Sequence, residues 1–466
     1  MLKDGLENLS GGALRIVVAL ISLPVIIKNL GIELFGTLSI LTAIVNLGAL
    51  SEFGLSTYAT IYTSGLKQKD KTNNIIYLLG LAFLFSSFTS IVLISATQWI
   101  SKILFPSYSS KQVSNALVWI GFAIIARACS QTMVGILNSH KCFRQTNKIL
   151  SNSFILSQGA LLIVSYISKD IIDLSLVIFL GAFMPVFFTL RKIKNYLVIP
   201  FTFNISIDLK KSRDILGKSA YMAANNIVNV SYNQVDKIIL GIYLTQAQLG
   251  IYSTFTAIGS QLNALSLAVC APLLSYLPGK DLKDNIVDYK NSTEVCCIVA
   301  AGLAAVLILF GQKICEIIFP EIPRSAFPSY VVIIWVYFLI SLHAPAYYCL
   351  IALGKTKTIL YTCSFATIVS LSAILLGARF GGLIFACIGN LGYLIIAIML
   401  YKVKKILGFG CLNLNAICAA FLLTASSTLF LGYHNKVFVC FALAMFLLSA
   451  TLFFSKSART MTMLQK

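Results

Sequence analysis

The feature that most constrains this chain is a succession of apolar segments, each long enough to cross a lipid bilayer as a helix. A helix that spans about 30 Å of hydrocarbon needs about 20 mainly apolar residues. Fourteen segments of the sequence qualify: 9–29, 35–62, 75–97, 113–138, 149–168, 171–190, 215–240, 247–276, 293–312, 328–352, 359–377, 381–401, 412–432 and 437–455. The sequence therefore predicts an all-α polytopic membrane protein with about fourteen transmembrane helices.

Charge supports this prediction and assigns an orientation. The 466 residues are 58% hydrophobic and 11% charged, which lies outside the usual range of soluble proteins. With a cytoplasmic N-terminus, the 36 Lys and Arg residues divide into 25 on cytoplasmic loops and nine on the outer side, which leaves Arg15 and Arg127 inside spans. Cytoplasmic loops of membrane proteins carry such an excess. The net charge of +20 thus reflects topology and not a nucleic-acid partner, and we expect both termini in the cytoplasm.

Neither a metal centre nor a cleaved signal is indicated. The twelve cysteines are scattered, mostly within apolar runs, and no CxxC pair occurs, so we predict no cofactor and no metal site. The first apolar run follows acidic residues and lacks a small-residue cleavage site, which is typical of a retained first helix. No loop is long enough for a soluble domain.

An internal repeat divides the chain. The stretch "LGIELFGTLSILTAIVNL" from Leu30 aligns with "LTQAQLGIYSTFTAIGSQL" from Leu244 at an offset of 214, and "TNKIL" aligns with "TKTIL" at an offset of 210. Six spans per copy give both copies the same orientation, related by an axis along the membrane normal. We expect an N-lobe over 1–195, a basic cytoplasmic linker over 196–214, a C-lobe over 215–403 and a C-terminal helix pair over 404–466. Two such lobes with a cleft between them are the architecture that alternating access requires.

A stripe of polar residues runs along the seventh span. At about 100° per residue, one helix face collects Asp236 and four amides, with Lys237 at its edge. The amides are Asn225, Asn226, Asn229 and Asn233. Such amides can hold helices together through hydrogen bonds. The length of the stripe favours the alternative, that it lines a water-filled cavity between the lobes.

Ionisable residues inside spans need a reason, because each costs roughly 2.5 to 3.5 kcal/mol near a helix centre on insertion scales. Arg127 lies near the middle of the fourth span, whereas Arg15 and Glu52 lie in the first and second spans and could neutralise one another. A cavity with arginines suits an anionic group, since the guanidinium matches phosphate oxygens. Glu52 and Asp236 are the positions at which a proton or sodium ion could bind.

Two strings carry a resemblance to a known family. "LPVIIKNLGIELFGTLSILTAIVNLGALSEFGLS" in spans one and two, and "NQVDKIILGIYLTQAQLGIYS" in spans seven and eight, resemble polysaccharide-unit flippases of the Wzx type. These belong to the multidrug/oligosaccharidyl-lipid/polysaccharide exporter superfamily. The resemblance implies a fold of two six-helix lobes like that of the multidrug exporters and the peptidoglycan-precursor flippases. Many members have twelve spans, so the two C-terminal spans are a departure, although the peptidoglycan-precursor flippases have fourteen.

The resemblance also implies an activity and a place in the cell. It implies that a polyprenyl-pyrophosphate-linked oligosaccharide moves from the cytoplasmic to the outer leaflet of a bacterial plasma membrane, for O-antigen, capsule or related glycan assembly. Contacts with a polysaccharide polymerase and a chain-length protein would follow. The family has a cationic central cavity, and Arg15, Arg127 and Lys237 are the positions that would supply it here.

Two other functions are open at this point. A cation-coupled multidrug antiporter of the same superfamily would favour carboxylates and aromatic rings in its cavity, so Arg127 argues against it. A membrane-bound glycan polymerase or ligase would place acid, base or arginine residues in a sizeable outer loop, and the predicted outer loops are short. We therefore expect a transporter and not an enzyme.

Overall fold

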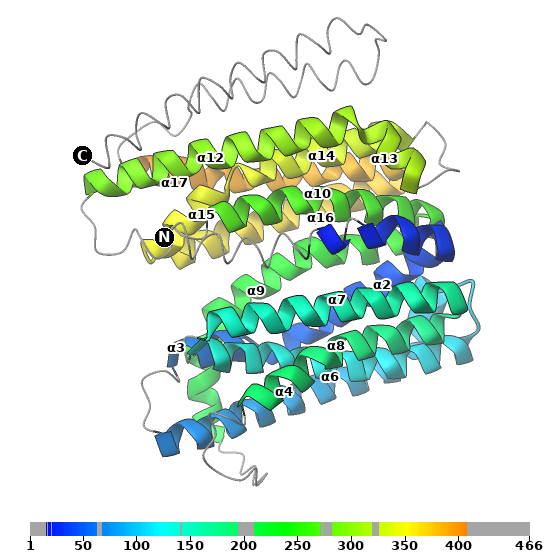
Figure 1. Ribbon diagram of the computed structural model, residues 1–466, viewed down its shortest axis with the longest axis horizontal. Helices are drawn as coiled ribbons and strands as arrows, with labels where there is room; N and C mark the ends of the chain where they lie inside the picture. The colour runs from blue at the N-terminus through cyan, green and yellow to red at the C-terminus, as the bar shows by residue number, and fades with distance from the viewer. Residues whose placement is uncertain are drawn as a thin grey trace, which may run out of the picture. The chain divides into compact units, whose positions relative to one another are not determined.

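A computed structural model describes residues 15, 17–19, 21–62, 68–139, 142–193, 209–270, 273, 282–318 and 326–407. Every regular element in these ranges is helical (Figure 1), which confirms the predicted all-α class. The elements are α2 (Ile32–Gly48), η1 (Ala49–Glu52), α3 (Leu55–Tyr62), α4 (Gln68–Ser95), α5 (Thr97–Leu104), α6 (Ser110–Ser139), α7 (Phe143–Ile167), α8 (Ile171–Ile193), α9 (Leu209–Tyr243), α10 (Gln246–Cys270), α12 (Leu282–Leu309), α13 (Gly311–Ile318), α14 (Phe327–Ser341), α15 (Ala344–Ala352), α16 (Thr356–Gly389), η3 (Asn390–Ala397) and α17 (Ile398–Leu407).

Eight helical stretches of the described ranges are long and apolar enough to cross a membrane, so the chain is a multi-pass membrane protein. A shorter apolar helix, Val17–Leu30, falls in the predicted first span. α9 and α10 occupy the predicted seventh and eighth spans but are not among the eight stretches. The predicted spans 412–432 and 437–455 lie outside the described residues. These observations are consistent with fourteen spans.

One of the eight stretches, Thr356–Leu407, is far too long for a single crossing, at 52 residues. It folds back on itself at Gly382, which has φ 71°, a value that favours glycine. On either side of this turn the two legs pack closely: a Cβ atom at Gly389 would lie 2.6 Å from the backbone nitrogen of Ile374, and one at Gly392 would lie 2.8 Å from Cα of Ser370. This turn lies within a few residues of the predicted boundary between spans 359–377 and 381–401.

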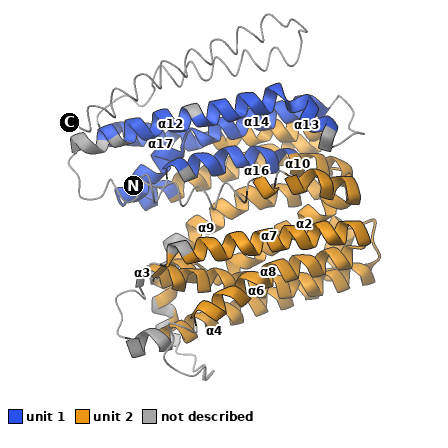
Figure 2. Ribbon diagram, viewed as in Figure 1, with its two compact units in different colours: residues 1, 255–359, 394–466 blue, residues 2–254, 360–393 orange. Residues whose placement is uncertain are grey.

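Contacts divide the chain into two compact units, coloured in Figure 2. The larger contains the described residues of Leu2–Thr254 and Leu360–Tyr393, and the smaller those of Phe255–Ile359 and Leu394–Lys466. In the larger unit α6 packs against α4 and α8, and α8 packs against α7. In the smaller unit α12 packs against α14, where Tyr330 donates a hydrogen bond of 2.9 Å to the carbonyl of Leu307. The bounds of the predicted lobes and linker differ from these units and stay predictions.

The helix bounds support the internal repeat. α4 and α12 both have 28 residues and begin 214 positions apart, at Gln68 and Leu282. α5 and α13 both have eight residues, are strongly amphipathic, and begin at Thr97 and Gly311, again 214 positions apart. α2 and α10 begin at Ile32 and Gln246 with the same separation. The offset of the short matched strings is therefore also the offset between three pairs of helices in the same order.

The repeat brings equivalent residues into contact where α2 crosses the start of α10. A Cβ atom at Gly36 would collide with the carbonyl oxygen of Gln246, and one at Gly250 would collide with the carbonyl oxygen of Ile32. Gly36 and Gly250 are equivalent in the repeat, and so are Ile32 and Gln246. The contact is thus reciprocal, as between two copies related by a two-fold axis, and both sides need glycine for backbones to approach this closely.

The second span is broken, which the sequence prediction of one helix over 35–62 did not include. α2 gives way to the 3₁₀ turn η1, followed by Phe53 at φ 47° and Gly54 at φ 74°, before α3 begins. A left-handed conformation at phenylalanine is uncommon and is held by its surroundings. In the second copy the equivalent positions, 263–268, lie within the uninterrupted α10. The break therefore distinguishes the first copy from the second.

Candidate functional site

A cavity of about 580 Å³ lies within the larger unit, at the break of the second span. Its walls come from η1, α3, α6, α7, α8 and α9, with Arg15 from the first helical segment. The lining residues are Arg15, Leu50, Glu52, Gly54, Ser56, Thr57, Thr60, Arg127, Ser130, Gln131, Val134, Gly135, Asn138, Leu150, Pro185, Ala223, Asn226 and Val230. Four residues that the sequence analysis singled out therefore line this cavity. Arg15, Glu52 and Arg127 come from the first, second and fourth spans, and Asn226 comes from the polar stripe of the seventh.

Arg127 is an exposed side chain on the cavity face of α6. Ser130, Gln131, Val134 and Asn138 share this face at helical spacing and also line the cavity. Within the described ranges the Arg127 side chain has neither a hydrogen bond nor an ion pair. A guanidinium carries five N–H donors in a planar fork, so Arg127 offers its full donor set to whatever enters the cavity.

Glu52 ends η1 and is buried, with 5% of its surface exposed. Each carboxylate oxygen accepts a hydrogen bond from a neutral hydroxyl. Ser56 Oγ donates to Oε1 at 2.7 Å, and Thr132 Oγ1 donates to Oε2 at 3.2 Å. The break in the second span makes this possible, because it turns Glu52 toward both the following helix α3 and the facing helix α6.

Close packing fixes the break against its neighbours. A Cβ atom at Gly135 of α6 would collide with the carbonyl oxygen of Ser56, and one at Gly54 would lie 3.1 Å from Cβ and N of Ala223 in α9. Thr60 Oγ1 also donates to the carbonyl of Gly135, at 3.1 Å. α3 is therefore held between α6 and α9, and this wall of the cavity is tightly packed.

The amide stripe of α9 is divided. Asn226 lines the cavity with Ala223 and Val230, whereas Asn225, Asn229 and Asn233 are not among the lining residues. Asn233 is exposed and its Nδ2 donates to the carbonyl of Asn229 at 2.7 Å, and the buried Oδ1 of Asn225 has no hydrogen-bond partner in the described ranges. Of the four predicted amides, the structure brings only Asn226 to the arginines.

Asp236 and Lys237 also lie away from this cavity, in a separate polar cluster of the larger unit. Asp236 is 3% exposed, and its carboxylate accepts hydrogen bonds from Tyr252 Oη at 2.8 Å and from the backbone nitrogen of Lys237 at 2.7 Å. Asn390 Nδ2 donates to Tyr252 Oη at 3.1 Å. The half-buried Lys237 turns its Nζ to Gln234 Oε1, at 3.4 Å. The adjacent acid and base thus have different partners.

Sequence reasoning missed Ser56, Thr132, Tyr252 and Asn390. Isolated hydroxyls and a tyrosine inside spans give no signal of their own, since serine and threonine commonly bond to their own helix. Among the described residues no group of three or more His, Cys, Asp or Glu side chains could hold a metal ion.

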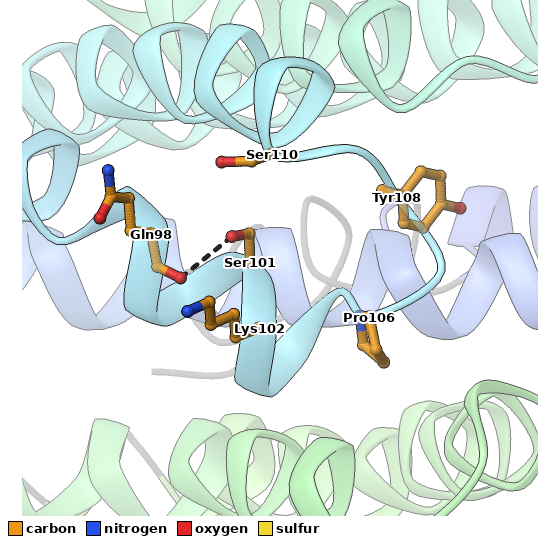
Figure 3. A pocket seen from close by; sticks show the side chains of 6 residues that line it. All are labelled: Gln98, Ser101, Lys102, Pro106, Tyr108 and Ser110. Carbon is orange, nitrogen blue, oxygen red and sulfur yellow. Dashed lines mark hydrogen bonds between the residues drawn. The ribbon is translucent and has the colours of Figure 1, made fainter.

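A smaller cavity of about 480 Å³ lies between α5 and the start of α6 (Figure 3). It is lined by Gln98, Ser101, Lys102, Pro106, Tyr108 and Ser110. The Ser101 hydroxyl is bound within α5, to the carbonyl of Gln98 at 3.1 Å, and Lys102 is an exposed lysine. This cavity lacks the converging buried and charged groups of the larger one.

Comparison with known proteins gives one family and one fold. A family described as "Polysaccharide biosynthesis protein" matches residues 29–322. The probable low-salt glycan biosynthesis flippase Agl15 of Haloferax volcanii is 25% identical over 223 residues, which cover 47% of this chain and 45% of that protein. The match thus spans less than half the length of this curated relative.

Solved structures extend the likeness to nearly the whole chain. Lipid II flippase MurJ in an inward closed conformation has a TM-score of 0.74 at 12% identity and covers 98% of this chain and 100% of its own. An inward-facing multidrug resistance MATE family transporter of the MOP superfamily has a TM-score of 0.65 at 11% identity and covers 91% and 99%. The MATE multidrug transporter DinF-BH has a TM-score of 0.63 at 14% identity and covers 87% and 96%. At these identities the likeness establishes the fold.

Proposed function

We propose that this chain, which belongs to the polysaccharide biosynthesis protein family, is a flippase for a polyprenyl-pyrophosphate-linked oligosaccharide. It moves this substrate from the cytoplasmic to the outer leaflet of a bacterial plasma membrane, for O-antigen, capsule or related surface glycan assembly. The named activity of the Haloferax volcanii relative, a glycan biosynthesis flippase, supports the substrate class. The lining of the larger cavity supplies chemistry that suits this substrate.

The observation that carries the proposal is Arg127, whose side chain has no hydrogen-bond or ion-pair partner in the described part of the chain and lies in a cavity that Arg15 also lines. A cation in the membrane region is costly, so an arginine with its donors free indicates an anionic ligand. A pyrophosphate offers several acceptor oxygens in a geometry that the guanidinium fork matches. Arg127 is therefore the main contact to the pyrophosphate, and Arg15 is the second. Lys237 lies outside this cavity and is not part of the contact.

The polar part of the remaining lining suits the sugars. Gln131, Asn138 and Asn226 supply amide donors and acceptors, and Ser130 and Thr57 supply hydroxyls. These groups can exchange hydrogen bonds with water for hydrogen bonds with sugar hydroxyls at little net cost. The lipid tail stays in the bilayer while the headgroup crosses.

Translocation follows an alternating-access cycle between the two repeat copies. In this cycle the reciprocal crossing at Gly36 and Gly250 lies, by the predicted topology, near the outer ends of its helices, so that it closes the outer side. Glu52 and Asp236 are the candidates for a coupling proton or sodium ion. Each is buried, and the hydrogen-bond donors to its carboxylate in the described part of the chain are neutral hydroxyl and backbone N–H groups.

Replacement of Arg127 in a strain that depends on this gene tests the proposal. We expect Arg127→Ala, at normal expression, to abolish surface glycan, and Arg127→Lys to retain a part of it, because lysine keeps the charge and loses the fork. Arg379→Ala is the matched control, since Arg379 is exposed and packs over the ring of Phe380 at 5.4 Å. Unchanged surface glycan in Arg127→Ala would remove Arg127 from the anion site. Lost drug efflux with normal glycan would point instead to a multidrug antiporter.

A further inference from the structure

The carboxylate of Glu52 lines the same cavity as two arginines, Arg15 and Arg127, with which a carboxylate can form an ion pair. Carboxylate and guanidinium groups form bidentate pairs readily, and the attraction is stronger away from bulk water. Such a pair would satisfy Arg127 internally and would compete with any anionic ligand. Yet both Glu52 oxygens are bound by hydroxyls and not by Arg127.

The positions of the hydroxyls explain why the two groups stay apart. Thr132 follows Arg127 by five residues on α6, which places it about 140° around the helix and about 7.5 Å along it. Arg127 lies on the face that lines the cavity, whereas Thr132 is fully buried and is not among the lining residues. Thr132 therefore draws the carboxylate toward the side of α6 that faces away from Arg127.

The second hydroxyl, that of Ser56, binds the other carboxylate oxygen of Glu52 from α3. Ser56 is four residues after Glu52, on the first turn of α3, and α3 is held in place by the contact between Ser56 and Gly135. Thr132 Oγ1 lies 3.2 Å from the carbonyl oxygen of Ala128 as well as from Glu52. The carboxylate is the stronger acceptor of the two because it is charged. Two fixed donors thus define the orientation of Glu52.

We propose that Ser56 and Thr132 are positioning residues that hold Glu52 away from Arg127 and so keep the arginine available for the substrate anion. This inference rests on the proposed function, because it deepens the role of the same anion site. It assigns a task to Thr132, which does not line the cavity, and to Ser56, which does. Without them the carboxylate loses both hydroxyl donors and can turn toward the cavity that Arg127 lines.

The test measures binding of inorganic pyrophosphate to the purified full-length chain in nanodiscs, by calorimetry. We expect Thr132→Val, which keeps the side-chain shape, to weaken binding about tenfold, the change typical for loss of one hydrogen bond to a charged group. Ser56→Ala acts in the same direction. In a Glu52→Gln background we expect Thr132→Val to have no effect, because no carboxylate remains at this position to pair with Arg127. Thr293→Val is the control, since the Thr293 hydroxyl bonds to Tyr289 of its own helix, at 2.8 Å.

A second readout needs no ligand. Phenylglyoxal modifies accessible guanidinium groups, and mass spectrometry reports the rate at Arg127 alone. We expect Thr132→Val to slow this rate about tenfold, as the carboxylate covers the arginine, whereas a simple loss of packing would speed it.

The outcomes separate the positioning role from the function on which it rests. Weakening of pyrophosphate binding by Thr132→Val to the same extent with and without the Glu52→Gln substitution overturns the positioning role. An unchanged phenylglyoxal rate does the same. Failure of the unsubstituted chain to bind pyrophosphate overturns the anion site itself, and the positioning role with it.

Discussion

Glu52 and Asp236 are two buried carboxylates of the larger unit, and each is held by hydroxyl groups. Glu52 lies at a cavity, whereas Asp236 lies among protein groups, with Tyr252 fully buried beside it. Both could be singled out from the sequence, because an acid inside a span is rare. Their partners could not, because Tyr252 meets Asn390 only through packing of segments 138 positions apart. Propensity and periodicity carry no information on such a pair.

Loss of the Tyr252 hydroxyl should destabilise the protein. We expect Tyr252→Phe to lower the free energy of unfolding by about 1 to 3 kcal/mol, because the buried Asp236 loses a hydrogen-bond donor. The thermal midpoint of the purified protein measures this change. Tyr243→Phe is the control on the helix that carries Asp236, since Tyr243 is 43% exposed. Equal midpoints for the two variants would show that the Tyr252 hydroxyl does not stabilise Asp236.

At the element scale, the broken second span is the feature that the sequence did not predict. The segment is apolar enough to suggest one helix, and its Phe53 at φ 47° is a residue that normally avoids this conformation. The break is stabilised instead by α6 and α9, which pack against Gly54 and Ser56 from outside the span. By contrast, the hairpin at Gly382 lies close to the boundary that the hydropathy pattern predicts between two spans.

The reciprocal glycine crossing gives a prediction for the elements that meet there. We expect Gly36→Ala to force α2 and α10 apart, because the added Cβ atom collides with the carbonyl oxygen of Gln246. The outer side should then open more often. A membrane-impermeant maleimide added to intact cells should label Asn138→Cys, in the cavity, faster in the Gly36→Ala background, above the background of the native cysteines.

Gly159→Ala is the matched control, because a Cβ atom there meets nothing within 4 Å. Equal labelling of Asn138→Cys in the Gly36→Ala and Gly159→Ala backgrounds would mean that this crossing does not close the outer side. Gly250→Ala should behave as Gly36→Ala does, since the contact is reciprocal.

At the scale of the whole molecule, the class could be predicted because the hydropathy pattern extends along the whole chain, and the repeat and the family because short matched strings mark them. Hydropathy predicts membrane helices well since the bilayer leaves few alternatives. The predicted site residues divide: Arg15, Glu52, Arg127 and Asn226 line one cavity, whereas Asp236, Lys237 and the other amides do not. Which polar face of a span lies at a cavity depends on how helices rotate and break, and this is decided by tertiary packing.

The most direct test of the account is a translocation measurement with the purified chain in liposomes. A polyprenyl-pyrophosphate-linked oligosaccharide is placed in both leaflets, and an external glycosidase removes the sugars that reach the outside. Without protein about half of the substrate is protected. We predict that the unsubstituted chain makes nearly all of it accessible, that Arg127→Ala leaves half protected, and that Arg379→Ala behaves as the unsubstituted chain does. Protection of half of the substrate in the presence of the folded, unsubstituted chain would contradict the account.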